Sequence, residues 1–194
     1  MSQFINLFID YAGEGVMFEQ PTDSEIEFFI EELKASADET NIVIDIWRTF
    51  GLRNYLDGLF CFVNPNVYNP IAQKFPNISS KCCVFARSSL GGLFLLDELA
   101  VGKSVIYLNP HLGVRKIIGT SIEILLAVEL GAESFWHREC YGKFELKVIE
   151  KYGPLAFDEC YAFVPALALG GSESMKNIQK VKVKEHLEFL SQLY

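Results

Sequence analysis

Residues 159–172 constrain the fold most strongly, because this stretch contains a single charged side chain, Glu159. Its sequence is ECYAFVPALALGGS, and residues 162–169 are all apolar or proline. A run of this kind is costly to expose, so we expect it to be a core element rather than a solvated loop. The rest of the chain must then supply the layers that cover it.

The same stretch predicts a strand followed by a tight return. Residues 160–164 are aromatic and β-favouring, Pro165 cannot donate to a further ladder, and Gly170-Gly171 is typical of a turn. Residues 177–183 then alternate in polarity with a period of two, which indicates a second strand with one wetter face.

Length and composition indicate a folded chain of one domain or two closely packed lobes. The 194 residues are 50% hydrophobic and include 16 Phe and 8 Tyr. No run reaches the roughly 18 apolar residues of a membrane span, and the first ten residues lack a cationic leader, so we expect a cytoplasmic protein without membrane contact. The five cysteines lie in apolar surroundings and are predicted to be reduced core thiols: Cys61, Cys82, Cys83, Cys140 and Cys160.

The negative charge is concentrated in the first third of the chain. Residues 1–60 carry twelve acidic and three basic side chains, a balance of −9, whereas residues 61–194 carry 13 acidic and 14 basic side chains. Such a segment repels nucleic acid and anionic lipid and attracts a cationic partner. We therefore expect no direct contact with nucleic acid.

Two capping boxes predict two helices within this acidic region. Thr22 with Glu25 begins a helix that runs to about residue 35, and Ser36 with Glu39 begins another that runs through residue 50. Phe28 points away from the apolar stripe of the first helix, toward Glu31 and Glu32. An outward phenylalanine among carboxylates is a candidate contact for a partner, and its simpler interpretation is that residues 1–16 cover it.

Beyond residue 59 short strands and helices alternate. Strands are predicted over residues 59–63, 81–87, 93–96 and 104–108, as parts of one antiparallel sheet, and helices over residues 66–75, 121–130, 143–152 and 183–193. The predicted class is α+β, a mostly antiparallel sheet with packed helices and an acidic helical N-terminal lobe. We divide the chain into residues 1–105 and 106–194, as two regions of one unit that share a sheet.

No catalytic or metal-binding constellation is visible in the sequence. His137 and Cys140 lack further ligands at suitable spacing, and His111 is expected to decorate a hairpin loop. The adjacent acids Asp97-Glu98 and Asp158-Glu159 are interpreted as solvated charge. We therefore predict a protein that is not an enzyme and uses no metal or cofactor.

Several motifs resemble known families. Residues 55–65, YLDGLFCFVNP, preceded by Trp47-Arg48-Thr49-Phe50-Gly51, are similar to the GAD-like domain, and the similarity continues through residues 84–87, 92–94 and 107–113. Residues 153–155 and 158–172, with Gln179-Lys180-Val181 and Glu185-His186-Leu187, resemble the C-terminal domain of type VI secretion DNase-immunity proteins. The first region is accordingly GAD-like, and the second is of the immunity type.

This resemblance implies a cytoplasmic, non-enzymatic immunity protein that binds a cognate nuclease toxin and blocks it. The predicted contact residues come from the acidic region and would face a basic DNA-binding or active-site surface of the toxin: Glu14, Glu25, Phe28, Glu31, Glu32 and Glu39. Two alternatives stay open. One is a regulatory or adaptor protein that uses the same surface on another partner, and the other is a small-ligand enzyme with a site near His111 and Arg87. The sequence gives no oligomeric state.

Overall fold

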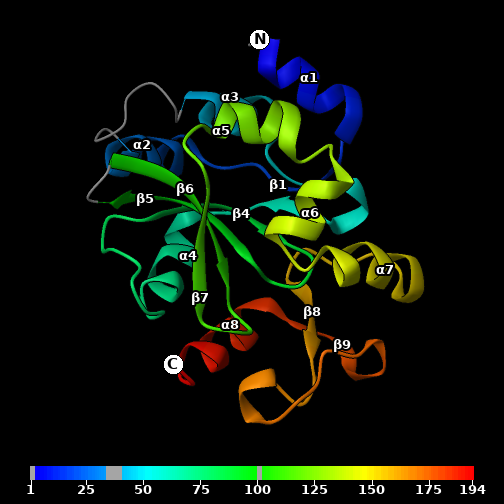
Figure 1. The fold of residues 1–194 in the computed structure, drawn as a ribbon. Coiled ribbons are helices and arrows are strands. Elements are labelled where there is room, and N and C mark those ends of the chain that lie inside the picture. The colour runs from blue at the N-terminus through cyan, green and yellow to red at the C-terminus, as the bar shows by residue number, and fades with distance from the viewer. Residues whose placement is uncertain (1–2, 34–40, 100–101) are drawn as a thin grey trace.

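The computed structural model describes residues 3–33, 41–99 and 102–194, and within them seven strands form one antiparallel sheet (Figure 1). Neighbours in the sheet are also neighbours in sequence, in the order β1 to β7. The strands are β1 (Val16–Glu19), β2 (Leu52–Tyr55), β3 (Phe60–Phe62), β4 (Cys83–Ser88), β5 (Leu93–Leu99), β6 (Gly102–Asn109) and β7 (Val114–Gly119). A separate antiparallel pair contains β8 (Glu159–Phe163) and β9 (Ile178–Lys182).

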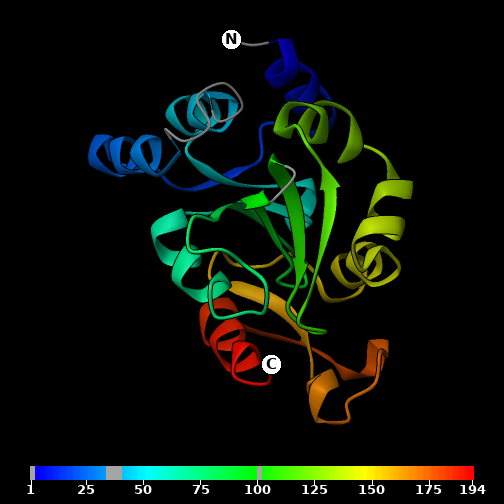
Figure 2. The same ribbon diagram turned by 60° about the vertical axis from the view of Figure 1, so that its left-hand side comes forward.

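Helices cover both faces of the large sheet (Figures 1 and 2). The main ones are α1 (Gln3–Ala12), α2 (Asp23–Leu33), α3 (Asn41–Phe50), α4 (Pro65–Ala72), α6 (Glu133–Glu139), α7 (Gly142–Tyr152) and α8 (Val183–Ser191), and a short α5 (Ile122–Ile124) continues into a π-helical turn, Leu125–Glu129. Helices α1, α2, α3 and α6 pack with the first core cluster, whereas α4 and α8 pack with the second.

Strand β5 shows why its sequence is apolar at successive positions. Phe94 and Leu96 face the first core cluster, and Leu93 and Leu95 face the second. A strand buried on both faces carries apolar side chains throughout instead of alternating with polar ones. The central strands therefore hold three layers together, with helices on either side of the sheet.

The predicted α+β class and several predicted elements are confirmed. Thr22 and Glu25 form the reciprocal capping box at the start of α2, with N–O distances of 2.9 Å and 3.3 Å. Asn64 caps α4, and β8 pairs with β9 as expected. The predicted tight return between these two strands is wrong, because residues 164–177 connect them and include the 3-10 turns Leu167–Leu169 and Met175–Asn177. The other predicted box, Ser36 with Glu39, lies outside the described residues. The boundary proposed at residues 105/106 lies inside β6, and the division into two regions stays a prediction.

Three expectations were wrong about burial. Most of the apolar run after β8 leaves the core, since Val164 is 38% and Leu169 60% exposed, whereas Ala166 stays buried in the second core cluster. The reason is that the ladder with β9 ends at Phe163↔Ile178. Asp97 is buried rather than solvated, and its carboxylate accepts hydrogen bonds from the backbone N and Oγ of Ser79. His111 lies in the β6–β7 turn as expected, but its side chain is fully buried instead of decorating the surface.

Candidate partner-binding surface

Two adjoining hollows lie where the N-terminal segment meets residues 130–155. The larger has a volume of about 810 Å³ and the smaller about 370 Å³, and both are lined by Tyr11, Leu56 and Asp57. We call them together the β1 groove, because Val16 and Phe18 of β1 line the larger one. The two hollows adjoin, because these three residues border both of them. Its walls come from segments that are distant in sequence.

Local backbone geometry positions the loop that leads into β1. Gly15 has a φ of +66°, and a methyl group there would lie 2.7 Å from the Asn54 carbonyl oxygen. Arg53 is hydrogen-bonded to this loop: its Nη1 donates to the carbonyl oxygen of Glu14 at 2.7 Å and to that of Gly15 at 3.4 Å. The close approach therefore requires glycine, and it holds Glu14 at the rim.

The rim opposite this loop has an unusual backbone. Leu56 and Asp57 both have positive φ values, +53° and +55°, and Gly58 follows at +101°. Non-glycine residues rarely adopt this region, and pairs of them persist only where the surrounding structure enforces the conformation. The effect here is to expose the Asp57 carboxylate at the point where the two hollows meet.

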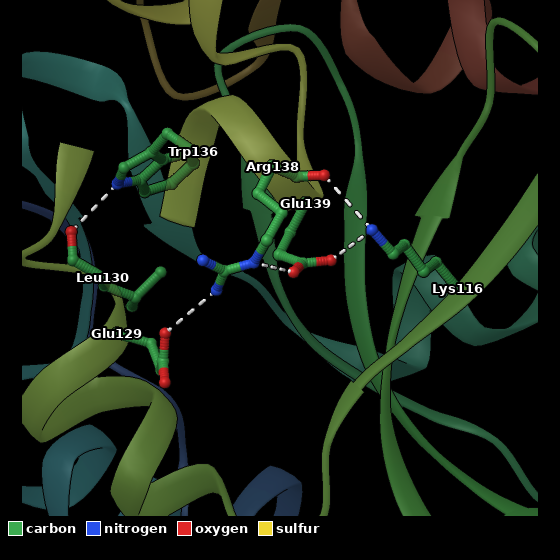
Figure 3. Close-up of polar contacts among 6 residues, drawn as sticks. All are labelled: Lys116, Glu129, Leu130, Trp136, Arg138 and Glu139. Atoms are coloured by element: carbon green, nitrogen blue, oxygen red, sulfur yellow. Dashed lines mark hydrogen bonds and ion pairs between the residues drawn. The ribbon is translucent and has the colours of Figure 1, made fainter. Parts of the chain in front are cut away.

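Aromatic side chains and an ion-pair network fix the far wall. The Tyr11 hydroxyl donates to the Leu126 carbonyl, and Trp136 Nε1 donates to the Leu130 carbonyl oxygen at 2.9 Å. Figure 3 shows the network beside Trp136, in which Lys116 of β7 contacts Glu139 of α6 at 2.5 Å and Arg138 bridges Glu139 to Glu129. Exposed pairs of this kind add little stability, and the buried Phe135 and Trp136 pack α6 into the first core cluster.

The charged side chains that line the groove are all acidic. They are Glu14, Asp57 and Glu133, and no Lys or Arg is among the described residues that form either hollow. Glu133 also contacts Nε2 of His137 at 3.1 Å, one helical turn further along α6. Between the carboxylates lie apolar side chains such as Leu59, Leu146 and Leu155. The surface combines negative charge with apolar contact area.

The structure separates the predicted contact residues into different roles. Glu14 lines the groove, and Phe28 is 47% exposed on α2, as predicted. Glu25 caps its own helix, and its Oε1 accepts from Asn64 Nδ2 at 2.7 Å. The hydrogen bond from the Thr22 backbone lowers the pKa of Glu25. The side chains of Glu31 and Glu32 and the whole of Glu39 lie outside the described residues.

A second cluster, which we call the polar junction, is buried between the sheet and residues 141–163. It contains Arg87, Ser88, Ser89, His111 and Glu145, each at most 1% exposed. Glu145 of α7 accepts from Ser89 Oγ and, at 3.0 Å, from the backbone N of Leu90. Burial raises the pKa of Glu145 to about 7.

Two further hydrogen bonds of the polar junction are made to backbone carbonyl groups of the protein. Arg87 Nη2 donates to the Phe157 carbonyl at 2.7 Å, and His111 Nε2 lies 2.9 Å from the Leu90 carbonyl oxygen. Burial lowers the pKa of His111 to about 3. Neither hollow of the β1 groove is lined by His111 or Arg87. These residues connect segments of the scaffold.

Other classes of site receive no support from the described residues. All five cysteines are free thiols, and Cys61, Cys82, Cys83 and Cys160 are buried. No grouping of three or more potential metal-ligating side chains occurs in the described part of the chain. Across the same ranges, none of the helices has the length and apolar character needed to span a bilayer.

Sequence reasoning missed most of the groove. Asp57 was noticed only as part of the motif YLDGLFCFVNP, and Trp136 and Glu133 were not singled out. Residues 3–12, 16–19, 52–55, 114–119 and 133–139 were not predicted as elements, yet the first three of these build the N-terminal wall. The closely spaced Gly13 and Gly15 are a local signal, since they suggest an irregular connection before β1.

Comparisons with known proteins agree with this architecture. Residues 126–194 match the sequence model of a family described as T6SS immunity protein Tdi1, C-terminal. Among solved structures, the crystal structure of Atu4351 from Agrobacterium tumefaciens has a TM-score of 0.73 and 19% sequence identity, and the match covers 99% of this chain and 89% of that one. No curated protein sequence matches significantly. The chain thus has the fold of Atu4351, and its residues 126–194 are similar to the C-terminal part of the T6SS immunity protein Tdi1.

Proposed function

We propose that the protein is a cytoplasmic immunity protein that binds and neutralises a nuclease toxin of the type VI secretion system. The observation that carries this proposal is the similarity of residues 126–194 to the T6SS immunity protein Tdi1. These residues include β8, β9, α7 and α8 and the Glu145 contacts of the polar junction. The resemblance of residues 55–65 to the GAD-like domain is consistent with the same assignment. Neutralisation would require tight binding and no chemistry.

The mode of inhibition we propose is occlusion of a basic DNA-binding or active-site surface on the toxin. Nucleases bind DNA through cationic surfaces, so an acidic protein surface competes for the same groups. Residues 1–60 supply the charge, Glu14 places part of it in the β1 groove, and Phe28 offers an exposed aromatic anchor. Charge would chiefly speed association, whereas the aromatic contact would slow dissociation.

The test is co-expression with candidate nuclease toxins, starting with the reading frame next to this gene. We expect the chain to restore growth, to form a stable complex on size exclusion and to abolish DNA cleavage in vitro. A Glu31→Lys/Glu32→Lys variant should associate at least about tenfold more slowly, while Glu185→Lys on α8 serves as the charge control. Unchanged association of the double variant would refute the electrostatic part, and protection against no toxin would refute the assignment.

The adaptor alternative predicts a different outcome for the same experiment. A neighbouring metabolic operon, together with co-purification of a non-toxin partner, would favour it. The small-ligand alternative gains nothing from the structure, because His111 and Arg87 are buried and hydrogen-bonded within the polar junction.

A further inference from the structure

We propose that the outer edge of β1 binds an extended cationic segment of a protein partner, which adds to the sheet as a further strand and lies in the β1 groove. This inference rests on the proposed function, under which the segment belongs to the toxin. Three observations lead to it: the free edge of β1, its exposed apolar side chains, and the acidic lining of the adjoining groove.

Strand β1 is the terminal strand of the large sheet. It pairs with β2 through Val16↔Asn54, Met17↔Arg53 and Glu19↔Leu52, and no strand of the described chain pairs with its other edge. An edge strand presents a row of backbone N–H and C=O groups that can pair with an added strand. Folded proteins commonly guard such edges with charge, proline, a short strand or a bulge. Strand β1 has only four residues and a register shift between Met17 and Glu19, but its first three residues carry neither charge nor proline.

The side chains of β1 are apolar and lie at the surface. Val16 is 63% exposed, Met17 53% and Phe18 38%, although all three belong to a strand of the main sheet. Phe18 stacks on Phe157 with ring centroids 5.1 Å apart, so the strand is held in place next to residues 154–157. The ordered position of these exposed side chains suits alternating contacts with an incoming strand.

The charges near β1 select a cationic segment. Glu14 and Asp57 line the same hollow, and Glu19 ends the strand. The neighbouring cation, Arg53, is turned to the carbonyl oxygens of Phe50, Glu14 and Gly15. Nucleic acid is disfavoured, because its phosphates would face these carboxylates. Lysine or arginine at alternate positions of an extended peptide would instead supply both charge and N–H donors.

The probe for this inference is a fluorescent peptide of about ten residues with alternating Lys and Val, titrated into the full chain. Its matched control carries N-methyl groups on alternate amides, which block strand pairing but keep charge and apolar character. We expect methylation to weaken binding at least about tenfold, and hydrogen exchange at residues 16–19 to slow when the unmethylated peptide binds. Equal binding of both peptides, or no protection at residues 16–19, would overturn the proposal.

A variant pair tests the charge requirement. Glu14→Gln/Asp57→Asn removes two charges from the groove, and asparagine tolerates the positive φ of position 57. Glu27→Gln/Glu185→Gln removes two charges elsewhere. We expect about tenfold weaker peptide binding for the first and less than about twofold change for the second. Equal loss in both would show non-specific attraction and refute the site. The peptide assay does not use the toxin, so the two proposals can fail separately. If the chain protects cells from a toxin but does not bind the peptide, only this inference is refuted. If it binds the peptide but protects against no toxin, only the proposed function is refuted.

Discussion

The polar junction and the β1 groove both contain carboxylates, but only those of the junction are buried. In the junction, Glu145 Oε2 accepts from Ser89 and Leu90, and Arg87 Nη2 donates to Phe157, so these hydrogen bonds are made within the protein. In the groove, Glu14 and Asp57 are exposed, and apolar side chains of β1 face outward. A carboxylate in a cleft is therefore not informative by itself, and what matters is whether its partners are already present.

The difference also separates scaffold from contact surface. The junction joins the sheet to the segment that is similar to the Tdi1 C-terminal model, since Tyr161 N donates to the Ser89 carbonyl at 2.8 Å and His111 packs edge-on against Phe163. The groove lies between the N-terminal strands and that same segment. Residues 126–194 thus contribute to both, and substitutions in the two places should have different consequences.

The largest effect is expected for Glu145→Leu in the junction. Without the carboxylate, Ser89 Oγ and the backbone N of Leu90 become buried donors without their acceptor, which should lower the free energy of unfolding by about 2–4 kcal/mol. Urea denaturation measures the change. Glu14→Gln, the matched substitution in the groove, should change stability by less than about 0.5 kcal/mol. Similar losses in both variants would remove the distinction between the two regions.

Substitution of two glycines next to β1 should have a smaller effect on stability and tests the backbone geometry beside the groove. Gly13 and Gly15 both have positive φ, but a methyl group at Gly13 meets nothing within 4 Å, whereas one at Gly15 lies 2.7 Å from the Asn54 carbonyl oxygen. Gly13→Ala should cost about 1 kcal/mol of unfolding free energy from backbone strain alone. Gly15→Ala should cost about 2–3 kcal/mol, because steric overlap is added. Thermal unfolding of both variants measures the two costs. Equal costs would mean that the close approach of Gly15 to the Asn54 carbonyl oxygen is absent.

The smallest expected effect is a pH dependence that belongs to the junction. Burial raises the pKa of Glu145 from 4.5 to about 7, so the folded state binds its proton more tightly than the unfolded state. Its contribution to stability is then present below pH 4.5 and is lost as the pH rises to about 7. Relative to Glu145→Gln, the native protein should lose about 1–3 kcal/mol across this window.

His111 and His186 make stability change with pH in the opposite direction, and comparison of the native protein with Glu145→Gln cancels their contribution. Burial lowers the pKa of His111 to about 3 and that of His186 to about 4, so stability gained from their neutral forms increases as the pH rises to 6.5. Both proteins share these groups, and the difference between them reports Glu145. Parallel stability curves for the native and Glu145→Gln proteins would contradict the assigned shift.

Local features of the fold could be predicted well from the sequence. The Thr22–Glu25 box depends on residues three apart, and the strands β8 and β9 follow from a short apolar run and from a period-two alternation. Phe28 was predicted to point outward from helical periodicity alone, and it does. Such features are set by contacts between near neighbours, which the order of residues specifies directly.

The sequence by itself therefore determined the α+β class, the capped start of α2, the location of the negative charge and the resemblance to type VI immunity proteins. The tertiary structure decided which polar groups are satisfied. It buried His111 and Asp97, engaged Glu25 as a cap, and brought Glu14 and Asp57 together with Trp136 around one groove. These outcomes depend on how the sheet register and helix packing place distant segments side by side, and no local pattern encodes that placement.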